Sequence, residues 1–140
     1  MFDSQGASHT EIACRQLVEQ LPDELLNLEG LRNRCMGNIQ LVERILNKFQ
    51  QRMPEELEEL EKALELSDTE QIARIAHRVK GTSASVSAST LQQAATEIED
   101  LSRAGRITEI PVRIEQLRGE WDRCNRVVCD VISGAEQKCF

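Results

Sequence analysis

His77 and its neighbours in the sequence form a candidate reactive site. His77 is one of only two histidines in the chain. Its neighbours at helical spacing are small (Ala73, Gly81 and Ala84), and Lys80 follows it one turn along. An imidazole with an ordinary pKa of about 6.5 is mostly a neutral nucleophile at pH 7 and needs no partner base. A lysine ammonium beside it could hold a doubly negative phosphoryl group. This combination indicates a histidine that accepts and releases a phosphoryl group.

The direction of the His77 side chain follows from helical periodicity. At about 100° per residue, the ring points roughly 140° away from the apolar stripe of the same segment, so we expect it to face solvent. Arg74 and Arg78 are expected to make the local field positive. An ordinary surface histidine remains the alternative on spacing alone, and His9, which has no clustered partners, is interpreted as one.

The elements that must position His77 are helices, because apolar residues recur at intervals of three and four and almost never alternate. Pro54 separates the first two stripes and suits either a first helical turn or a kink. The stripes are Ile39, Val42, Ile45, Leu46, Phe49 and Met53; Leu57, Leu60 and Leu64; Ile72, Ile75, Ala76 and Val79; Leu91, Ala94, Ala95, Ile98 and Leu101; and Ile110, Ile114, Leu117, Trp121, Cys124, Val128 and Val131.

Polar and glycine residues between the stripes predict where the helices begin and end. Asn38 and Thr108 are expected to cap helices, and Ser67-x-x-Glu70 and Ser89-x-x-Gln92 match the capping-box pattern. Gly105 and Gly134 are expected to follow helix C-termini.

Short connections between these helices favour an all-α fold, an antiparallel up-down four-helix bundle preceded by one or two short helices. We predict that the bundle spans residues 27–133, with long helices of about 15–24 residues. Residues 1–26 would form an N-terminal segment with a short helix near residues 12–21. A second short helix is expected near residues 28–36, and residues 134–140 are expected to be a frayed tail.

Composition excludes several classes of function. The chain has 140 residues, a net charge of −7 and 3% aromatic residues, which argues against binding to nucleic acid or an anionic membrane. It contains no nucleotide-binding glycine motif, no apolar run of membrane-spanning length and no secretory signal pattern, so we expect a cytoplasmic protein. The five cysteines are widely spaced and are expected to be apolar fillers without a disulfide or a metal site.

The segment from Ala76 to Ala84, AHRVKGTSA, resembles the signature of histidine-containing phosphotransfer (HPt) domains. The similarity extends over roughly residues 28–132, through Phe49, Pro54, Leu57 and Leu60 upstream and residues 91–99 downstream. One departure is the turn Ser87-Ala88, where many members have Gly-Ala, and a serine tolerates positive φ less well than a glycine.

The resemblance implies specific roles for residues and partners. His77 would accept a phosphoryl group from the aspartate of one receiver domain and pass it to another, through its outer ring nitrogen. Lys80 would stabilise the phosphoryl group, and Gly81 would give access to the ring. The partner-contacting residues would be Ala73, Arg74, Arg78 and Ala84.

The same resemblance implies no cofactor and no metal of the chain's own, since the receiver would supply Mg²⁺. The expected partners are response-regulator receiver domains and a hybrid sensor histidine kinase, and the chain itself, a monomer, would have no ATP-binding or kinase activity. A non-catalytic helical-bundle interaction module is the alternative. A histidine-kinase dimerisation domain fits less well, because Arg78 stands where those domains usually carry an acid.

Overall fold

The structure is a computed structural model that describes residues 25–138. The predicted all-α fold is confirmed, and no strand occurs within this range. The predicted short helix near residues 12–21 lies outside it. The elements are α2 (Leu28–Arg34), α3 (Ile39–Glu65), α4 (Thr69–Ser85), α5 (Ser89–Arg103), the 3-10 turn η1 (Ile107–Glu109) and α6 (Ile110–Lys138).

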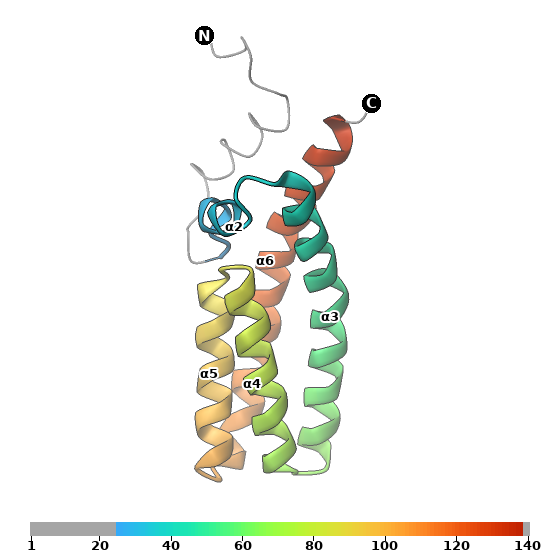
Figure 1. The fold of residues 1–140 in the computed structure, drawn as a ribbon. Coiled ribbons are helices and arrows are strands. Elements are labelled where there is room, and N and C mark those ends of the chain that lie inside the picture. Colours follow the sequence, from blue (N-terminus) through green and yellow to red (C-terminus); the bar gives the residue numbers. More distant parts are fainter. Residues whose placement is uncertain (1–24, 139–140) are drawn as a thin grey trace.

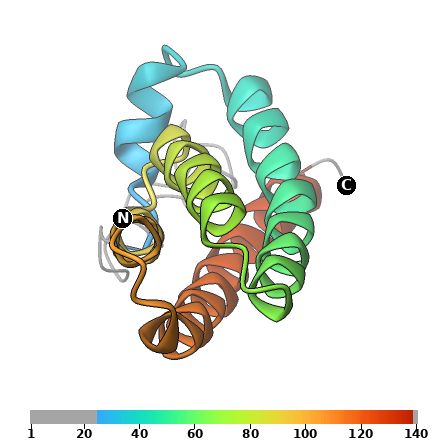
Figure 2. The same cartoon turned by 90° about the horizontal axis from the view of Figure 1, so that it is seen from below.

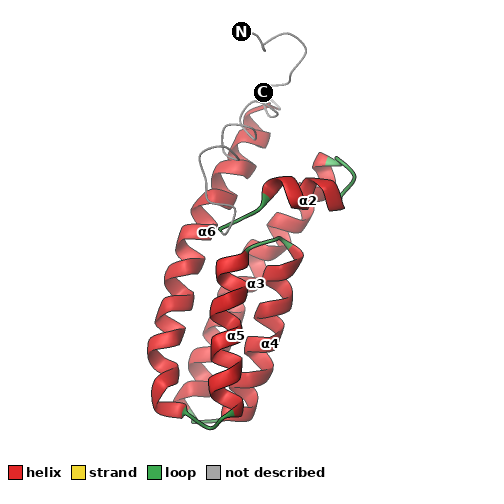
Figure 3. Ribbon diagram, turned by 90° about the vertical axis from the view of Figure 1, so that its left-hand side faces the viewer, coloured by secondary structure: helices red, strands yellow, loops and turns green. Residues whose placement is uncertain are grey.

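Helices α3 to α6 run up and down beside one another as the predicted bundle (Figure 1). Seen along the bundle, the four helices surround a shared interior (Figure 2). Helices α3 and α6, with 27 and 29 residues, are longer than expected and extend beyond the shorter α4–α5 hairpin. The short helix α2 lies across the end of that hairpin (Figure 3).

The predicted stripes supply one continuous core that runs from α2 to α6. On α4, Ile72, Ile75, Ala76 and Val79 are all fully buried, which fixes the rotation of this helix about its axis. Phe49 on α3 meets Trp121 on α6 edge to face, with ring centroids 5.2 Å apart. Such a pair adds about 1 kcal/mol beyond the apolar area it buries.

The start of each helix tests the predicted caps. Asn38 caps α3, as predicted, by accepting a hydrogen bond from the backbone N–H of Leu41 at 3.1 Å. Asp68, not Ser67, caps α4, because Ser67 takes the left-handed φ of +54° that closes the α3–α4 turn. The predicted cap at Ser89 is also wrong, since α5 already begins there.

The other predicted helix boundaries agree less well with the structure. Gly105 follows α5 with φ +72°, as predicted. Pro54 lies inside a continuous α3 and does not begin a new helix. Thr108 lies within η1, and α6 begins two residues later. The predicted helix end at Gly134 is wrong because α6 continues to Lys138.

Two of the three described cysteines behave as the predicted fillers. Cys35 and Cys124 are buried and free, whereas Cys129 is exposed, contrary to that expectation. Burial, with a smaller effect of the Glu120 charge, raises the pKa of the Cys124 thiol to about 12, so it stays protonated. Among the described helices, none is long and apolar enough to cross a membrane.

Candidate functional site

His77 lies on the outer face of α4, and 63% of its side chain is exposed. The predicted orientation is therefore confirmed: the buried face of α4 turns the ring toward solvent. Its Nδ1 atom is 3.2 Å from Oε2 of Glu99, which comes from the neighbouring helix α5. Helices α4 and α5 pack against each other more extensively than any other pair of elements. The ring is thus exposed but held from one side.

Glu99 is the centre of a small charged cluster, although only 8% of its side chain is exposed. Its carboxylate also meets Nζ of Lys80 at 3.1 Å and Nη2 of Arg103 at 2.8 Å. Burial alone would raise the pKa of Glu99, but the hydrogen bonds from Arg103 and Lys80 and the charges of Lys80 and His77 lower it to about 2. Glu99 is therefore ionised at neutral pH.

The ionised Glu99 determines how the His77 ring is used. A carboxylate can only accept hydrogen bonds, so the ring nitrogen facing it, Nδ1, must be the one that carries the hydrogen. In the neutral ring the other nitrogen, Nε2, then holds the free electron pair. The contact with Glu99 therefore fixes both the tautomer and the orientation of the ring.

Lys80 is placed one turn along α4 from His77, as the sequence predicted, but it is not a free cation. Its side chain is 31% exposed, and its ammonium pairs with Glu99. An ammonium has three N–H donors, and the contact with Glu99 occupies only part of this capacity. Lys80 can therefore orient Glu99 and still meet an anionic group beside the ring.

The small residues around His77 differ in accessibility. Gly81 is exposed, and a Cβ atom added there would meet nothing within 4 Å. Ala84 is partly exposed. Ala73, which was expected in this exposed ring, is only 4% exposed because the end of α5 packs beside it. It lies with Arg74, Ser102 and Arg103 in a surface hollow of about 510 Å³.

The two arginines expected to make the field positive are both engaged with acids. Arg74 pairs with Glu70 at 2.8 Å on the surface of α4. Arg78 turns toward α3, where it contacts Glu56 at 3.0 Å and Glu59 at 2.9 Å. The hydrogen bond from Arg78 to Glu56 raises the pKa of Arg78. The expectation of a local excess of positive charge from these arginines is therefore wrong.

The family model of the Hpt domain matches residues 44–126, a range that includes His77, Lys80 and Glu99. The chain belongs to the Hpt domain family. Proteins of this family carry phosphoryl groups on histidine in phosphorelays and are not kinases.

A solved structure shows the same fold. The crystal structure of histidine-containing phosphotransfer protein B (HptB) from Pseudomonas aeruginosa PAO1 matches this Hpt domain with a TM-score of 0.63 and 24% sequence identity. The match covers 84% of this chain and 93% of that chain. No curated protein sequence matches this one.

Sequence reasoning included Glu99 in the segment that resembles the family but gave no role to it or to Arg103, the two α5 residues that complete the charged cluster of this Hpt domain. The available signal was the position of Glu99 beside the apolar stripe of α5, four residues after Ala95 and three before Ser102, which are both buried. An acid at the edge of a buried stripe needs a partner. Only the packing of α5 against α4 shows which partner it has.

The turn after α4 adopts the backbone geometry that the sequence departure put in question. Ser87 has φ +61°, a conformation that favours glycine. Its hydroxyl accepts a hydrogen bond from Arg34 of α2, which also donates to the carbonyl of Ser85 at 3.0 Å. Helix α2 therefore covers this turn and ties it to the bundle, so that the serine is held in its unusual conformation.

Proposed function

We propose that this Hpt domain accepts a phosphoryl group on Nε2 of His77 from the aspartyl phosphate of one receiver domain and passes it to the aspartate of another. The observation that supports this proposal is the exposed imidazole whose Nδ1 faces the ionised carboxylate of Glu99 at 3.2 Å. That contact leaves Nε2 as the nucleophile on the solvent side.

The forward step is a displacement at phosphorus. The electron pair of Nε2 forms the N–P bond while the bond from phosphorus to the aspartate oxygen breaks. The carboxylate of the aspartate leaves with the electron pair of the broken P–O bond. The Nδ1 hydrogen stays in place, so the phosphorylated ring gains a positive charge that Glu99 stabilises. In the reverse direction the N–P bond breaks and a neutral imidazole leaves.

Lys80 has two roles in this proposal. It holds Glu99 in place together with Arg103, and its remaining donors neutralise the phosphoryl oxygens as charge develops on them. The carboxylate beside the ring, Glu99, already pairs with Lys80 and Arg103, so it is not free to bind a hard cation such as Mg²⁺. We therefore assign Mg²⁺ to the receiver domain.

The wider setting follows from the same proposal. The donor would be the receiver of a hybrid sensor histidine kinase, and the acceptor would be a response regulator in the cytoplasm. The Hpt domain would act as a monomer, so that His77 can present its solvent side to each receiver in turn. It would have no ATP-binding or kinase activity of its own.

The test is transfer of radiolabelled phosphate from a panel of phosphorylated receiver domains. We expect an acid-labile, base-stable label on this chain that disappears in His77→Gln and persists in His9→Gln. Lys80→Ala should keep the helical circular dichroism spectrum and slow transfer by roughly 100-fold, the lower end of the range for loss of one stabilising donor. The absence of label from every receiver would contradict the proposal and favour an interaction module.

A further inference from the structure

The two carboxylate oxygens of Glu99 are held by two different cations. Oε1 lies 3.1 Å from Nζ of Lys80. Oε2 accepts hydrogen bonds from Nη2 and Nε of Arg103 at 2.8 and 3.2 Å, and the same oxygen faces Nδ1 of His77 at 3.2 Å. The oxygen that meets the ring is therefore the one that Arg103 holds.

The two cations reach Glu99 from different helices. Lys80 comes from α4, three residues after His77, whereas Arg103 lies on α5, one turn after Glu99 itself. The contact of Arg103 with Glu99 is thus made within one helix and does not depend on the packing of α4. A guanidinium presents its N–H groups in a rigid plane, while an ammonium is a compact point charge on a flexible stem. Arg103 is suited to orient Glu99, and Lys80 is suited to move.

Phosphorylation of His77 would change these contacts unequally. The charge that develops on the phosphoryl oxygens draws the ammonium of Lys80 toward them and weakens its contact with Oε1. The ring must keep its Nδ1 hydrogen at that moment, because a neutral imidazole leaves readily in the onward step and an imidazolate does not. Glu99, of which only 8% is exposed, is costly to keep ionised without a partner. A cation that stays on Oε2 meets both needs.

We propose that Arg103 is a positioning residue for phosphotransfer: it holds Oε2 of Glu99 against Nδ1 of His77 while Lys80 turns to the phosphoryl group. This inference rests on the proposed function and gives the two cations of the cluster different tasks. Arg103 acts through Glu99, whereas Lys80 meets the transferred group. The bonds that form and break at phosphorus are those of the proposed transfer.

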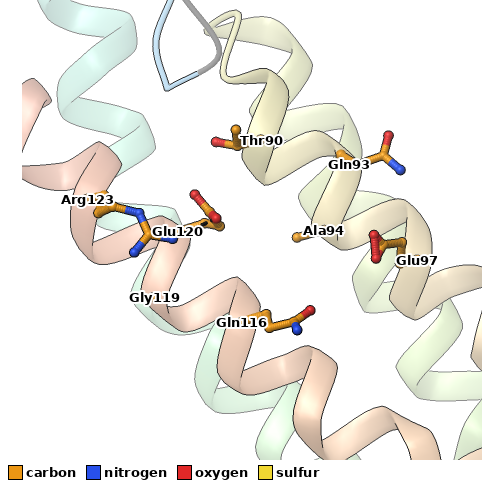
Figure 4. A pocket seen from close by; sticks show the side chains of 8 residues that line it. All are labelled: Thr90, Gln93, Ala94, Glu97, Gln116, Gly119, Glu120 and Arg123. Carbon is orange, nitrogen blue, oxygen red and sulfur yellow. Dashed lines mark ion pairs between the residues drawn. The ribbon is translucent and has the colours of Figure 1, made fainter. Parts of the chain in front are cut away.

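Another ion pair of α5 provides a matched control. Glu97 lines the hollow between α5 and α6 that Figure 4 shows, and it pairs at 3.0 Å with Arg113 of α6. Glu97 precedes Glu99 by two residues, which correspond to about 200° around a helix, so it points away from the Glu99 cluster. Arg113→Ala therefore takes an arginine from an acid of α5 without disturbing the surroundings of His77.

The first test is a double-mutant cycle, measured by transfer from a phosphorylated receiver domain and by labelling with phosphoramidate, which needs no docking. Arg103→Ala should lower kcat and the phosphoramidate rate about tenfold, the effect of one charge-assisted hydrogen bond, with KM changed less than about twofold. Added to Glu99→Ala, the same substitution should cost less than about twofold, because no carboxylate is left to hold. Arg113→Ala should keep both rates within about twofold of wild type.

The second test uses Lys80→Ala to imitate a lysine that has left Glu99. Nitrogen NMR of the His77 ring, in a His9→Gln background that leaves one histidine, reports which ring nitrogen carries the hydrogen. We expect Lys80→Ala to keep the hydrogen on Nδ1 and Lys80→Ala/Arg103→Ala to show a mixture of the two tautomers.

Three outcomes would overturn the role of Arg103 alone. They are a loss in Arg103→Ala that is equally large in the Glu99→Ala background, a loss confined to KM, and an Nδ1 hydrogen that persists in Lys80→Ala/Arg103→Ala. The proposed function fails separately, if phosphoramidate labels His77 with the expected pattern of rates but no phosphorylated receiver does. In that case Arg103 still positions the ring, but for a different phosphoryl donor.

Discussion

Around His77, three nitrogen-bearing side chains share the one carboxylate of Glu99. Glu99 fixes the tautomer of the His77 ring, and Lys80 and Arg103 keep Glu99 ionised. The contacts of His77 and Lys80 join α4 to α5, whereas Arg103 contacts Glu99 within α5. The reactivity of the ring at this site therefore depends on a residue that does not touch the transferred group.

The low pKa of Glu99 predicts how stability depends on pH. Its pKa is about 2 in the folded chain against an ordinary value of 4.5, so the unfolded chain binds the additional proton as the pH falls. The stability contributed by the ionised group is complete above about pH 4.5 and is lost as the pH falls toward 2, by at most about 3 kcal/mol.

Urea unfolding of the wild-type chain and Glu99→Gln between about pH 6 and pH 2, which includes both pKa values, measures this contribution. The two free energies of unfolding should converge as the pH falls. Glu58→Gln is the control, since Glu58 is 71% exposed and its pairing with Lys62 is on the surface. A gap between wild type and Glu99→Gln that stays constant with pH would refute the assignment.

At the scale of elements, α4 is fixed from both sides. On the α5 side the connection is the Glu99 cluster, and on the α3 side it is the pair of contacts from Arg78 to Glu56 and Glu59. Glu56 is the critical member of the second set, because only 5% of its side chain is exposed. Rotation of α4 about its axis, which would move His77, breaks one set or the other.

Removal of Arg78 should destabilise the bundle. Arg78→Ala leaves the buried carboxylate of Glu56 without its main partner, and we expect a loss of about 2–4 kcal/mol in the free energy of unfolding. Arg74→Ala is the matched control on the same helix, since Arg74 and Glu70 are both well exposed, and it should cost less than about 1 kcal/mol. Equal losses in the two variants, measured by chemical denaturation, would show that Glu56 does not need Arg78.

At Gly81, the stability of α4 and the rate of phosphotransfer should respond to a larger side chain in opposite directions. A side chain there meets nothing in this chain, and replacing a helical glycine by leucine should stabilise α4 by about 0.5–1 kcal/mol. Gly81→Leu should nevertheless slow phosphotransfer from a receiver, because it fills the space beside His77. Gly119→Leu, at a glycine of α6 with equally open surroundings, should transfer at the wild-type rate. Normal transfer by Gly81→Leu would show that the open space is incidental.

The sequence predicted the features of the site that depend on one helix, such as the direction of His77. It did not predict the contacts that depend on how two helices pack, such as that between His77 and Glu99. The 3–4 spacing of Ile72, Ile75 and Val79 was sufficient to turn His77 outward, since burial of one face determines the direction of the other. The partnership with Glu99 depends on the register between α4 and α5, which no local pattern contains. The misplaced cap at Ser67 has a local cause, because serine and the following aspartate both favour that position, and the turn geometry decides between them.

At the scale of the whole molecule, the core is continuous from α2 to α6 and has no internal boundary. Leu28 and Leu31 of α2 join the same cluster as the buried residues of α3 and α6. Arg34 adds hydrogen bonds from α2 to the end of α4, where a cation also complements the helix dipole. The hairpin that carries the site is thus closed at its end by an element distant in sequence.

This continuity predicts a single cooperative unfolding transition. Trp121 is the only tryptophan of the chain, and it packs on Phe49, so its fluorescence reports the contact between α6 and α3. Far-ultraviolet circular dichroism reports all the helices together. The two signals should give the same midpoint and the same free energy of unfolding in urea, within a range of about 5–15 kcal/mol that is typical of single domains. Arg34→Ala weakens only the α2 contacts, so it should lower the free energy of unfolding by roughly 1 kcal/mol and shift both signals to the same lower midpoint. A circular dichroism transition that precedes the fluorescence change would instead mean that part of the helical structure unfolds independently of the α3–α6 core.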